Sequence, residues 1–391
     1  MNYKLLLGLL FLNYVSLFSQ KRIDLKFILD GHQRECIIVI PGKLPPPNGY
    51  PVVFMLHGTS GDGEKFYNIS GWKELGEEEN FITVFPSSLT WCFVEDNIEK
   101  HNTRWVNGNV TEFPCSGPPQ NYVDDVKFLK LLATQIADSL PVNRKMIFAS
   151  GFSNGCSMIH KLAVDAGDVF AAVTGGSSIL TMSDSARPIN RIPIWTIVGT
   201  LDDRFIFSPY TELPFGGDSI LTYLQIPIGR VLGSQGLTDN FIKSETPITH
   251  TYQFLDNKPG ELAKPYIFTL VKDMIHEYPN GLNYPLNGPK IFWEFFKRSI
   301  TVGNELIEDK KYKVSVYPNP SNELITIDFS TWDTNWPISI NVFNAYGQSV
   351  YTRKLMENSK ITIYKKELGE GLFFIHIKNN SYSYSQKVIF N

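Results

Sequence analysis

Residues 151–155 read Gly-Phe-Ser-Asn-Gly and follow the pattern G-x-S-x-G. The apolar run at 145–149 predicts a buried strand before them, and residues 156–166 predict a helix after them. A strand, a tight turn and a helix around this pattern are typical of a nucleophile elbow, in which glycines relieve crowding. Ser153 would then stand at the N-terminus of a helix, where the dipole and free amides favour negative charge.

A serine hydroxyl is a weak nucleophile at neutral pH and needs a general base, which an acid orients. In this context the acid and then the histidine follow the serine along the chain, in loops after later strands. Asp202 follows a predicted strand at 194–198, and His276 follows another at 266–271. The order and the loop positions therefore predict Ser153, Asp202 and His276 as a catalytic group.

Two alternatives to these partners remain within the sequence. Asp203 is adjacent to Asp202 and competes with it for the role of the acid, and Asp202 is the preferred of the two. The other histidines lie in a turn, a loop, a helix or predicted strands, where a structural or solvated role is expected. They are His32, His57, His101, His160, His250 and His376.

Glycines follow the predicted strand at 51–56, in a loop that reads His-Gly-Thr-Ser-Gly-Asp-Gly over 57–63. An oxyanion hole needs two backbone N–H groups that point at the developing alkoxide. The residue after the nucleophile, Asn154, supplies the first, and the loop after this strand supplies the second. We therefore expect the amides of Thr59 and Asn154 to form the hole.

The chain of 391 residues has a net charge of −3, which gives no electrostatic case for binding nucleic acid. Residues 1–19 combine a lysine, an apolar core and small or uncharged residues before a possible cleavage site, as in a signal peptide. That apolar core is too short to span a bilayer, and no later segment is long enough. We expect an exported protein without a membrane span.

The four cysteines are read in that exported context, where disulfides can form. Cys92 and Cys115 bracket one predicted loop and are the favoured disulfide pair. Cys36 and Cys156 lie in a predicted strand and helix and are expected to be small buried residues. No Cys/His spacing resembles a zinc site, and no metal is expected.

Hydrophobic patterns divide the chain into four parts. After the signal peptide at 1–19, residues 20–300 alternate strands with helices, including an amphipathic helix at 122–140. A polar linker at 301–313 leads into alternating β-segments at 314–391, which suggest a small sandwich. Within the first domain, 87–120 reads as a long loop and 205–249 as a lid-like excursion.

Segments of the first domain together resemble the secreted esterases of the polyhydroxybutyrate depolymerase and feruloyl esterase group. The resemblance implies an α/β-hydrolase fold, a doubly wound and mainly parallel sheet, with ester hydrolysis by Ser153, Asp202 and His276 and no cofactor. The matching segments are 51–58, 71–72, 81–86, 124–128, 141–145, 151–155, 170–173, 199–202 and 276–281.

The tail resembles the C-terminal sorting domain of the type IX secretion system. Its matching segments are Tyr-Pro-Asn-Pro at 317–320, residues 340–347 and residues 369–375. The resemblance implies that the secretion machinery is a partner and that the protein is released or attached at the cell surface. A small carbohydrate-binding sandwich is the alternative.

The leading functional hypothesis is a secreted serine carboxylesterase for polyhydroxyalkanoates, or for feruloyl and acetyl esters of polysaccharides. A peptidase on the same scaffold and a non-catalytic glycan-binding protein are the alternatives. Trp91 and Trp105, with Phe93 and Phe113, lie in the long loop and could line a substrate cleft or pack that loop against the domain. Both tryptophans are taken here as candidate substrate-binding residues.

Overall fold

The structure is a computed structural model, and the parts of the chain that it describes have several gaps. The predicted signal peptide at 1–19 and most of the predicted linker at 301–313 lie outside the described residues. The described residues are 20–95, 97–107, 113–180, 187–188, 190–282, 286–301, 312–332, 337–344, 348–357, 360–378 and 383–391.

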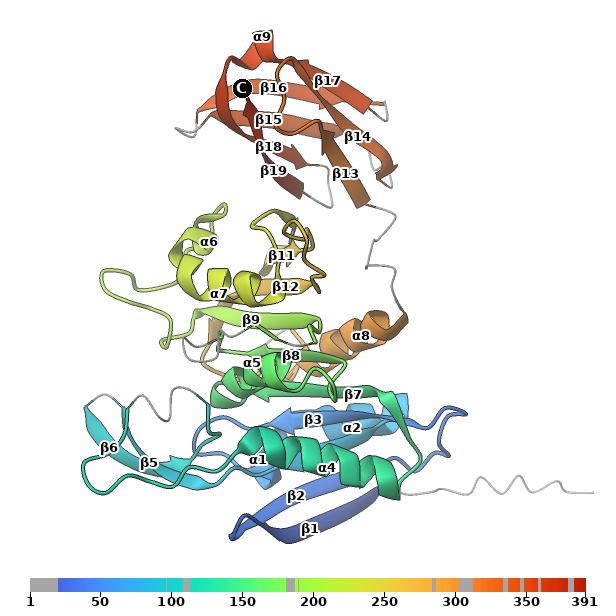
Figure 1. Cartoon of the computed structure of the whole chain (residues 1–391), viewed down its shortest axis with the longest axis vertical. Coiled ribbons are helices and arrows are strands. Elements are labelled where there is room, and N and C mark those ends of the chain that lie inside the picture. The colour runs from blue at the N-terminus through green and yellow to red at the C-terminus, as the bar shows by residue number, and fades with distance from the viewer. Residues whose placement is uncertain are drawn as a thin grey trace, which may run out of the picture.

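A mixed β-sheet forms the centre of the larger domain (Figure 1). Its middle strands, from β4 through β12, are parallel, and antiparallel strands flank them on both sides. In sheet order the strands are β1 (Lys21–Leu29), β2 (His32–Ile40), β4 (Ile82–Pro86), β3 (Tyr50–Leu56), β7 (Val142–Phe152), β8 (Ala172–Gly176), β9 (Ile194–Leu201), β12 (Tyr266–Ile275), β11 (Thr249–Phe254) and β10 (Phe241–Glu245).

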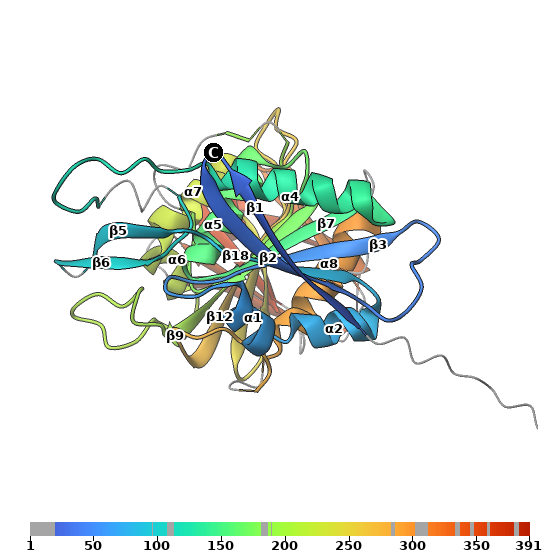
Figure 2. The same cartoon turned by 90° about the horizontal axis from the view of Figure 1, so that it is seen from below.

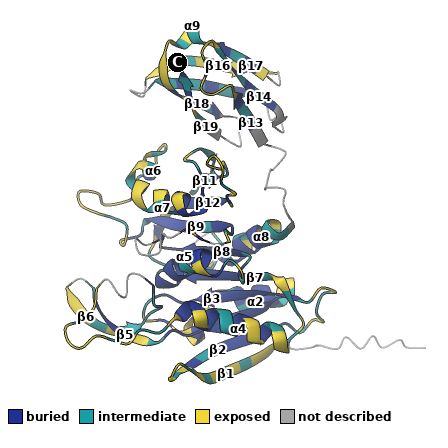
Figure 3. Ribbon diagram, in the orientation of Figure 1, coloured by how far each residue is buried: buried dark blue, intermediate teal, exposed yellow. Residues whose placement is uncertain are grey.

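Helices cover both faces of this sheet, so its central strands are buried on both sides (Figure 3). That burial explains why β3 and β4 are apolar throughout instead of alternating. One face carries α4 (Asp125–Ser139), α5 (Asn154–Asp165), α6 (Ser219–Tyr223) and α7 (Gln225–Gln235). The other face carries α1 (Gly63–Ile69), α2 (Trp72–Glu79) and α8 (Gly288–Thr301).

The segment 205–249 is not a cap, which corrects the lid-like prediction. Its two helices, α6 and α7, bury Ile220, Ile228 and Val231 in the same core as the sheet. Its last part forms strand β10, which pairs with β11. The segment is therefore mainly a crossover that covers the sheet between β9 and the outer strands. The part that follows Asp202 directly, up to α6, forms an outlying loop (Figure 1).

The predicted long loop at 87–120 contains a β-hairpin that the sequence analysis missed. Its strands are β5 (Thr90–Glu95) and β6 (Ile98–Thr103). A disulfide joins Cys92 to Cys115, with their Cα atoms 5.8 Å apart, and so connects the hairpin to the chain that follows it. Figure 2 shows the hairpin projecting on the same side of the molecule as the loop after β9.

The tail folds into two antiparallel sheets around a core of its own. One sheet contains β13 (Tyr312–Tyr317), β14 (Leu324–Trp332) and β17 (Lys360–Tyr364), and a short helix α9 (Lys365–Leu368) follows. The other contains β15 (Ile338–Asn344), β16 (Ser349–Leu355), β18 (Gly371–Lys378) and β19 (Ser383–Phe390). Strand β19 also pairs with β10, so the tail extends the sheet of the larger domain.

The α/β prediction is therefore confirmed in coarse form: a large mixed sheet with helices on both faces, followed by small antiparallel sheets. Among the described residues, no helix combines the length and apolar character that a membrane crossing requires.

Candidate functional site

Ser153 occupies a strained turn between β7 and α5. Its φ of 52° and ψ of −119° place a non-glycine residue at positive φ, outside the regions that side chains ordinarily adopt. Strain of this kind persists only where the surrounding structure enforces it, and it concentrates at functional sites. The turn raises Ser153 above the carboxyl end of the central parallel strands, at the first turn of α5.

The glycines on either side of Ser153 are required by close backbone approaches. A Cβ on Gly151 would lie 2.2 Å from the carbonyl oxygen of Gly155. A Cβ on Gly155 would lie 2.3 Å from the carbonyl oxygen of Leu56, at the end of β3. No side chain fits at either position, because such distances are far below van der Waals contact. The pattern G-x-S-x-G therefore follows from close packing within the turn at Gly151 and against the end of β3 at Gly155.

The structure brings Ser153, His276 and Asp202 together. His276 Nε2 lies 2.9 Å from Ser153 Oγ, and His276 Nδ1 lies 2.8 Å from Asp202 Oδ1. The three side chains follow β7, β12 and β9, whose parallel carboxyl ends meet at one edge of the sheet. The chain order serine, aspartate, histidine is the one that an elbow on such a sheet uses. The contacts form a continuous hydrogen-bonded relay from hydroxyl to carboxylate.

Asp202, and not its rival Asp203, forms the hydrogen bond to the histidine. Asp202 is fully buried, whereas the Asp203 side chain is 77% exposed and lies 3.8 Å from Arg204. The second Asp202 oxygen, Oδ2, has no hydrogen-bond partner among the described residues. A buried carboxylate beside one ring nitrogen fixes the imidazole tautomer with the proton on Nδ1. The other nitrogen is then free to accept the Ser153 proton.

The loop after β3 lies against the elbow, as expected for an oxyanion hole. A Cβ on Gly58 would lie 3.2 Å from the Ser153 Cβ, which shows how closely the two segments approach. No described residue accepts a hydrogen bond from the backbone amides of Thr59 or Asn154. Both amides are therefore available as donors beside Ser153. Their role as an oxyanion hole stays a prediction.

The two tryptophans are placed differently from the sequence-based expectation. Trp105 is fully buried and Trp91 is 7% exposed, so neither lines an open substrate cleft. Trp105 Nε1 donates to the carbonyl oxygen of His57 at 2.9 Å. Trp91 packs on Tyr122, with ring centroids 5.1 Å apart. The packing alternative that the sequence left open is the one that the structure favours, because both rings fill interior space.

His57 precedes the oxyanion loop and is fully buried. Its Nε2 accepts from the amide of Ser88 at 3.0 Å, and its Nδ1 lies 2.7 Å from the carbonyl oxygen of Gly58. The Nδ1 atom must therefore carry the proton, and no second proton fits without breaking the bond to Ser88. Burial lowers the pKa of His57 to about 4. This histidine is a neutral structural group, as the sequence analysis expected.

Exposed aromatic side chains lie on the loop that follows Asp202, and the sequence analysis missed them. Phe207 is 65% exposed and Tyr210 is 52% exposed. The Tyr223 ring packs against the rings of both Phe207 and Tyr210, and the Tyr223 hydroxyl accepts a hydrogen bond from the amide of Phe207 at 2.9 Å. Aromatic residues within a Pro- and Gly-containing stretch just after the acid were the available signal.

The free cysteines, Cys36 and Cys156, are both buried, as expected. Cys156 Sγ donates to the carbonyl oxygen of Ser178 at 3.2 Å. Burial raises the pKa of the Cys156 thiol well above its usual range, so the thiol stays protonated. Cys156 therefore serves as a packing residue beneath the elbow.

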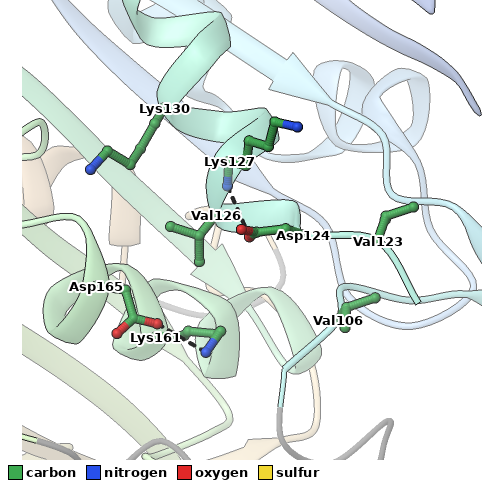
Figure 4. Close-up of a pocket in the computed structure, with 8 residues that line it drawn as sticks. All are labelled: Val106, Val123, Asp124, Val126, Lys127, Lys130, Lys161 and Asp165. Atoms are coloured by element: carbon green, nitrogen blue, oxygen red, sulfur yellow. Dashed lines mark hydrogen bonds and ion pairs between the residues drawn. The ribbon is translucent and has the colours of Figure 1, made fainter. Parts of the chain in front are cut away.

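A groove of about 670 Å³ lies between α4 and α5, and no triad residue lines it (Figure 4). Three lysines border it, but Lys127, Lys130 and Lys161 are each paired with a carboxylate at 2.7–2.9 Å. The paired charges leave the groove without a net attraction for an anion.

Comparisons with known proteins support an esterase-like chain with a sorting tail. Residues 315–391 match the secretion system C-terminal sorting domain. A bifunctional acetylxylan esterase/xylanase of Neocallimastix patriciarum is 25% identical over 175 residues, which cover 44% of this chain and 22% of that protein. Most of that match precedes the sorting domain, which is much shorter than 175 residues. The chain thus spans under a quarter of this curated relative.

Two solved structures have a similar course of chain. The acetyl xylan esterase of Aspergillus awamori is 15% identical, with a TM-score of 0.46, and covers 71% of this chain and 99% of its own. An S-formylglutathione hydrolase of Agrobacterium tumefaciens is 10% identical, with a TM-score of 0.47, and covers 72% and 96%.

The match to a sorting domain indicates where the protein is located, because a domain of this kind directs export from the cell. The resemblance of the tail to a type IX sorting domain is thereby confirmed. The chain carries a secretion system C-terminal sorting domain, is secreted or held at the cell surface, and is similar over 175 residues to a protein named as an acetylxylan esterase/xylanase.

Proposed function

We propose that the protein is a secreted serine carboxylesterase of the α/β-hydrolase type. The observation that carries this proposal is the relay Ser153–His276–Asp202, with contacts of 2.9 and 2.8 Å beside two available backbone amides. The same constellation recurs on unrelated folds and is recognised by its geometry.

The proposed reaction begins when Ser153 Oγ attacks the ester carbonyl while His276 Nε2 takes the hydroxyl proton. Asp202 stabilises the imidazolium that forms. The amides of Thr59 and Asn154 bind the oxyanion of the tetrahedral intermediate. Its collapse expels the alcohol, which receives the proton from His276 and leaves an acyl-enzyme. Water, activated by the same histidine, then releases the carboxylic acid.

Acetyl or feruloyl esters on polysaccharides are the proposed substrate class, ahead of polyhydroxyalkanoates. The similarity to a protein named as an acetylxylan esterase/xylanase supports this choice. The exposed Phe207 and Tyr210 support it too, because flat apolar rings offer faces on which a sugar or aryl ring can stack. Their loop follows Asp202 directly, so it lies near the predicted acyl-transfer site.

The test compares substitutions in the triad with one matched control. Ser153→Ala, Asp202→Asn and His276→Gln should each lower kcat on p-nitrophenyl acetate by at least about 10³-fold. Asp203→Asn removes the exposed neighbouring carboxylate and should keep activity within about twofold. Full activity in Ser153→Ala would overturn the proposal, and equal losses in Asp203→Asn and Asp202→Asn would overturn the role of Asp202.

A substrate panel then selects among the ester classes and the alternatives. It contains acetylated xylan, methyl ferulate, a polyhydroxybutyrate film and a peptidyl p-nitroanilide. Turnover of acetylated xylan or methyl ferulate is expected. Turnover of the film alone would move the substrate to polyhydroxyalkanoates, and turnover of the anilide alone would make the protein a peptidase. A folded protein that turns over none of them and takes no fluorophosphonate label on Ser153 would favour the non-catalytic binding alternative.

A further inference from the structure

Trp105 contacts both segments that supply the predicted oxyanion donors. Its indole Nε1 donates to the carbonyl oxygen of His57 at 2.9 Å, and its ring lies on the His57 ring with centroids 5.0 Å apart. Its backbone amide donates to Asn154 Oδ1 at 2.6 Å, and its carbonyl oxygen accepts from Asn154 Nδ2 at 3.3 Å. All three residues are buried.

These contacts connect segments that are distant in sequence. His57 directly precedes Gly58 and Thr59, while Asn154 directly follows Ser153. The single residue Trp105 is thus bonded to the oxyanion loop through its side chain and to the elbow through its backbone. A shift of either segment would break one of these buried bonds, and a buried polar group without a partner costs about 1–3 kcal/mol.

The chain on either side of Trp105 is anchored firmly. The amide of Val106 donates to Asp125 Oδ2 at 2.8 Å, and Asp125 forms a buried ion pair with Arg34 at 2.7 Å. On the other side, the carbonyl oxygen of Thr103 accepts from the amide of Ser60 at 3.0 Å. The segment 103–106 is therefore a fixed frame between α4 and the oxyanion loop.

We propose that Trp105 is a positioning residue that sets the distance between the Thr59 and Asn154 amides. The inference rests on the proposed function, because it assigns those amides to an oxyanion hole. It replaces the sequence-based expectation that Trp105 contacts substrate. It also explains the Asn154 side chain, whose two bonds to the Trp105 backbone hold the first residue of α5 in register with the loop.

An oxyanion hole acts on the transition state and leaves ground-state binding nearly unchanged. Loss of one donor from such a hole lowers kcat by about 10²–10³-fold. A substitution that only loosens the positions of the donors should cost less. Trp105→Phe keeps an aromatic ring beside His57 but removes the indole N–H, so the expected loss in kcat is about 10–100-fold, with KM nearly constant.

Trp91→Phe is the matched control in the full-length chain. Trp91 belongs to the same region and is also buried, but its Nε1 has no hydrogen-bond partner among the described residues. The readouts are kcat and KM on p-nitrophenyl acetate, corrected for active sites, and the inhibition constant of an aliphatic trifluoromethyl ketone. That ketone forms a hemiketal whose oxyanion occupies the hole. A general loss of folding would not raise the inhibition constant of the ketone by the same factor as it lowers kcat/KM, so the two readouts together report on the hole.

Trp105→Phe should raise the inhibition constant of the ketone by the same factor as it lowers kcat/KM, and Trp91→Phe should change neither quantity. Equal kinetics in the two variants, or a rise in KM at constant kcat in Trp105→Phe, would overturn the positioning role. If Trp105→Phe does not fold, Asn154→Asp tests the other contact of Trp105, the one to the elbow, because it keeps the acceptor for the Trp105 amide and loses the donor to the Trp105 carbonyl. Wild-type ketone affinity in folded Asn154→Asp would then overturn the proposal.

The outcome is separable from that of the proposed function. Loss of activity in Ser153→Ala with wild-type behaviour in Trp105→Phe would leave the esterase standing and remove the positioning role alone. Full activity in Ser153→Ala would remove the proposed function first.

Discussion

The buried His57 predicts a specific loss of stability in mild acid. Burial lowers its pKa from 6.5 to about 4 in the folded chain, while the unfolded chain regains the ordinary value. Between pH 6.5 and 4, His57 is therefore protonated in the unfolded state but stays neutral in the folded state. The contribution of His57 to the free energy of unfolding is therefore complete above pH 6.5 and falls as the pH drops toward 4. A pKa difference of this size corresponds to about 3 kcal/mol.

The assay is urea unfolding of the full chain at several pH values between 7 and 4, for the wild type and for His57→Gln. Glutamine can still accept from the Ser88 amide through its side-chain oxygen, but it does not titrate. The variant should be less stable than the wild type at pH 7. Between pH 7 and 4, however, its free energy of unfolding should fall by about 3 kcal/mol less than that of the wild type.

Lowered pKa values of His250 and His376 add to the acid loss in both proteins, so only the difference between the two slopes reports on His57. His32→Gln, at a partly exposed position at the start of β2, is the control. Identical slopes in the wild type and His57→Gln would refute the reasoning, because the folded state would then accept a proton on His57 without cost.

Three further predictions follow from single contacts or from the domain boundary. Gly155→Ala places a Cβ 2.3 Å from the Leu56 carbonyl oxygen and should abolish activity and lower Tm. The control Gly229→Ala, in open space on α7, should do neither, and equal effects of the two substitutions would contradict the steric requirement at the elbow. Phe207→Ala should raise KM for acetylated xylan severalfold and leave p-nitrophenyl acetate unchanged; a change in both would place Phe207 in the acyl-transfer site. A chain ending at residue 301 should keep its esterase activity but self-associate through the uncovered edge of β10, as light scattering would detect; an inactive, monomeric product would contradict both expectations.

The elbow and its partners were the most predictable part of the site. Gly151 and Gly155 flank Ser153 in a local pattern whose close contacts admit no side chain at either glycine, and the topology of such a sheet then dictates where Asp202 and His276 must follow. The continuous apolar runs of β3 and β4 likewise report burial on both faces. These features were visible because each leaves a recognisable mark on the sequence: a pentapeptide, a fixed chain order or a continuous apolar run.

The hairpin β5–β6 and the role of Trp105 could not be predicted in the same way. Lys100 and His101 on β6 interrupt the apolar alternation, because the hairpin projects from the domain and buries only part of its surface. A buried tryptophan in a loop is compatible with a cleft or with packing until its neighbours are known. The partners of Trp105 lie 48 and 49 positions away along the chain, where no local pattern identifies them.

The most direct measurement of the central claim is fluorophosphonate labelling of the full chain, with the modified residue located by mass spectrometry. An activated serine is required for this reaction. We expect one adduct per chain, on Ser153, formed in step with the loss of p-nitrophenyl acetate hydrolysis, and little adduct in His276→Gln. An adduct on another residue, or hydrolysis that persists after Ser153 is fully modified, would contradict it.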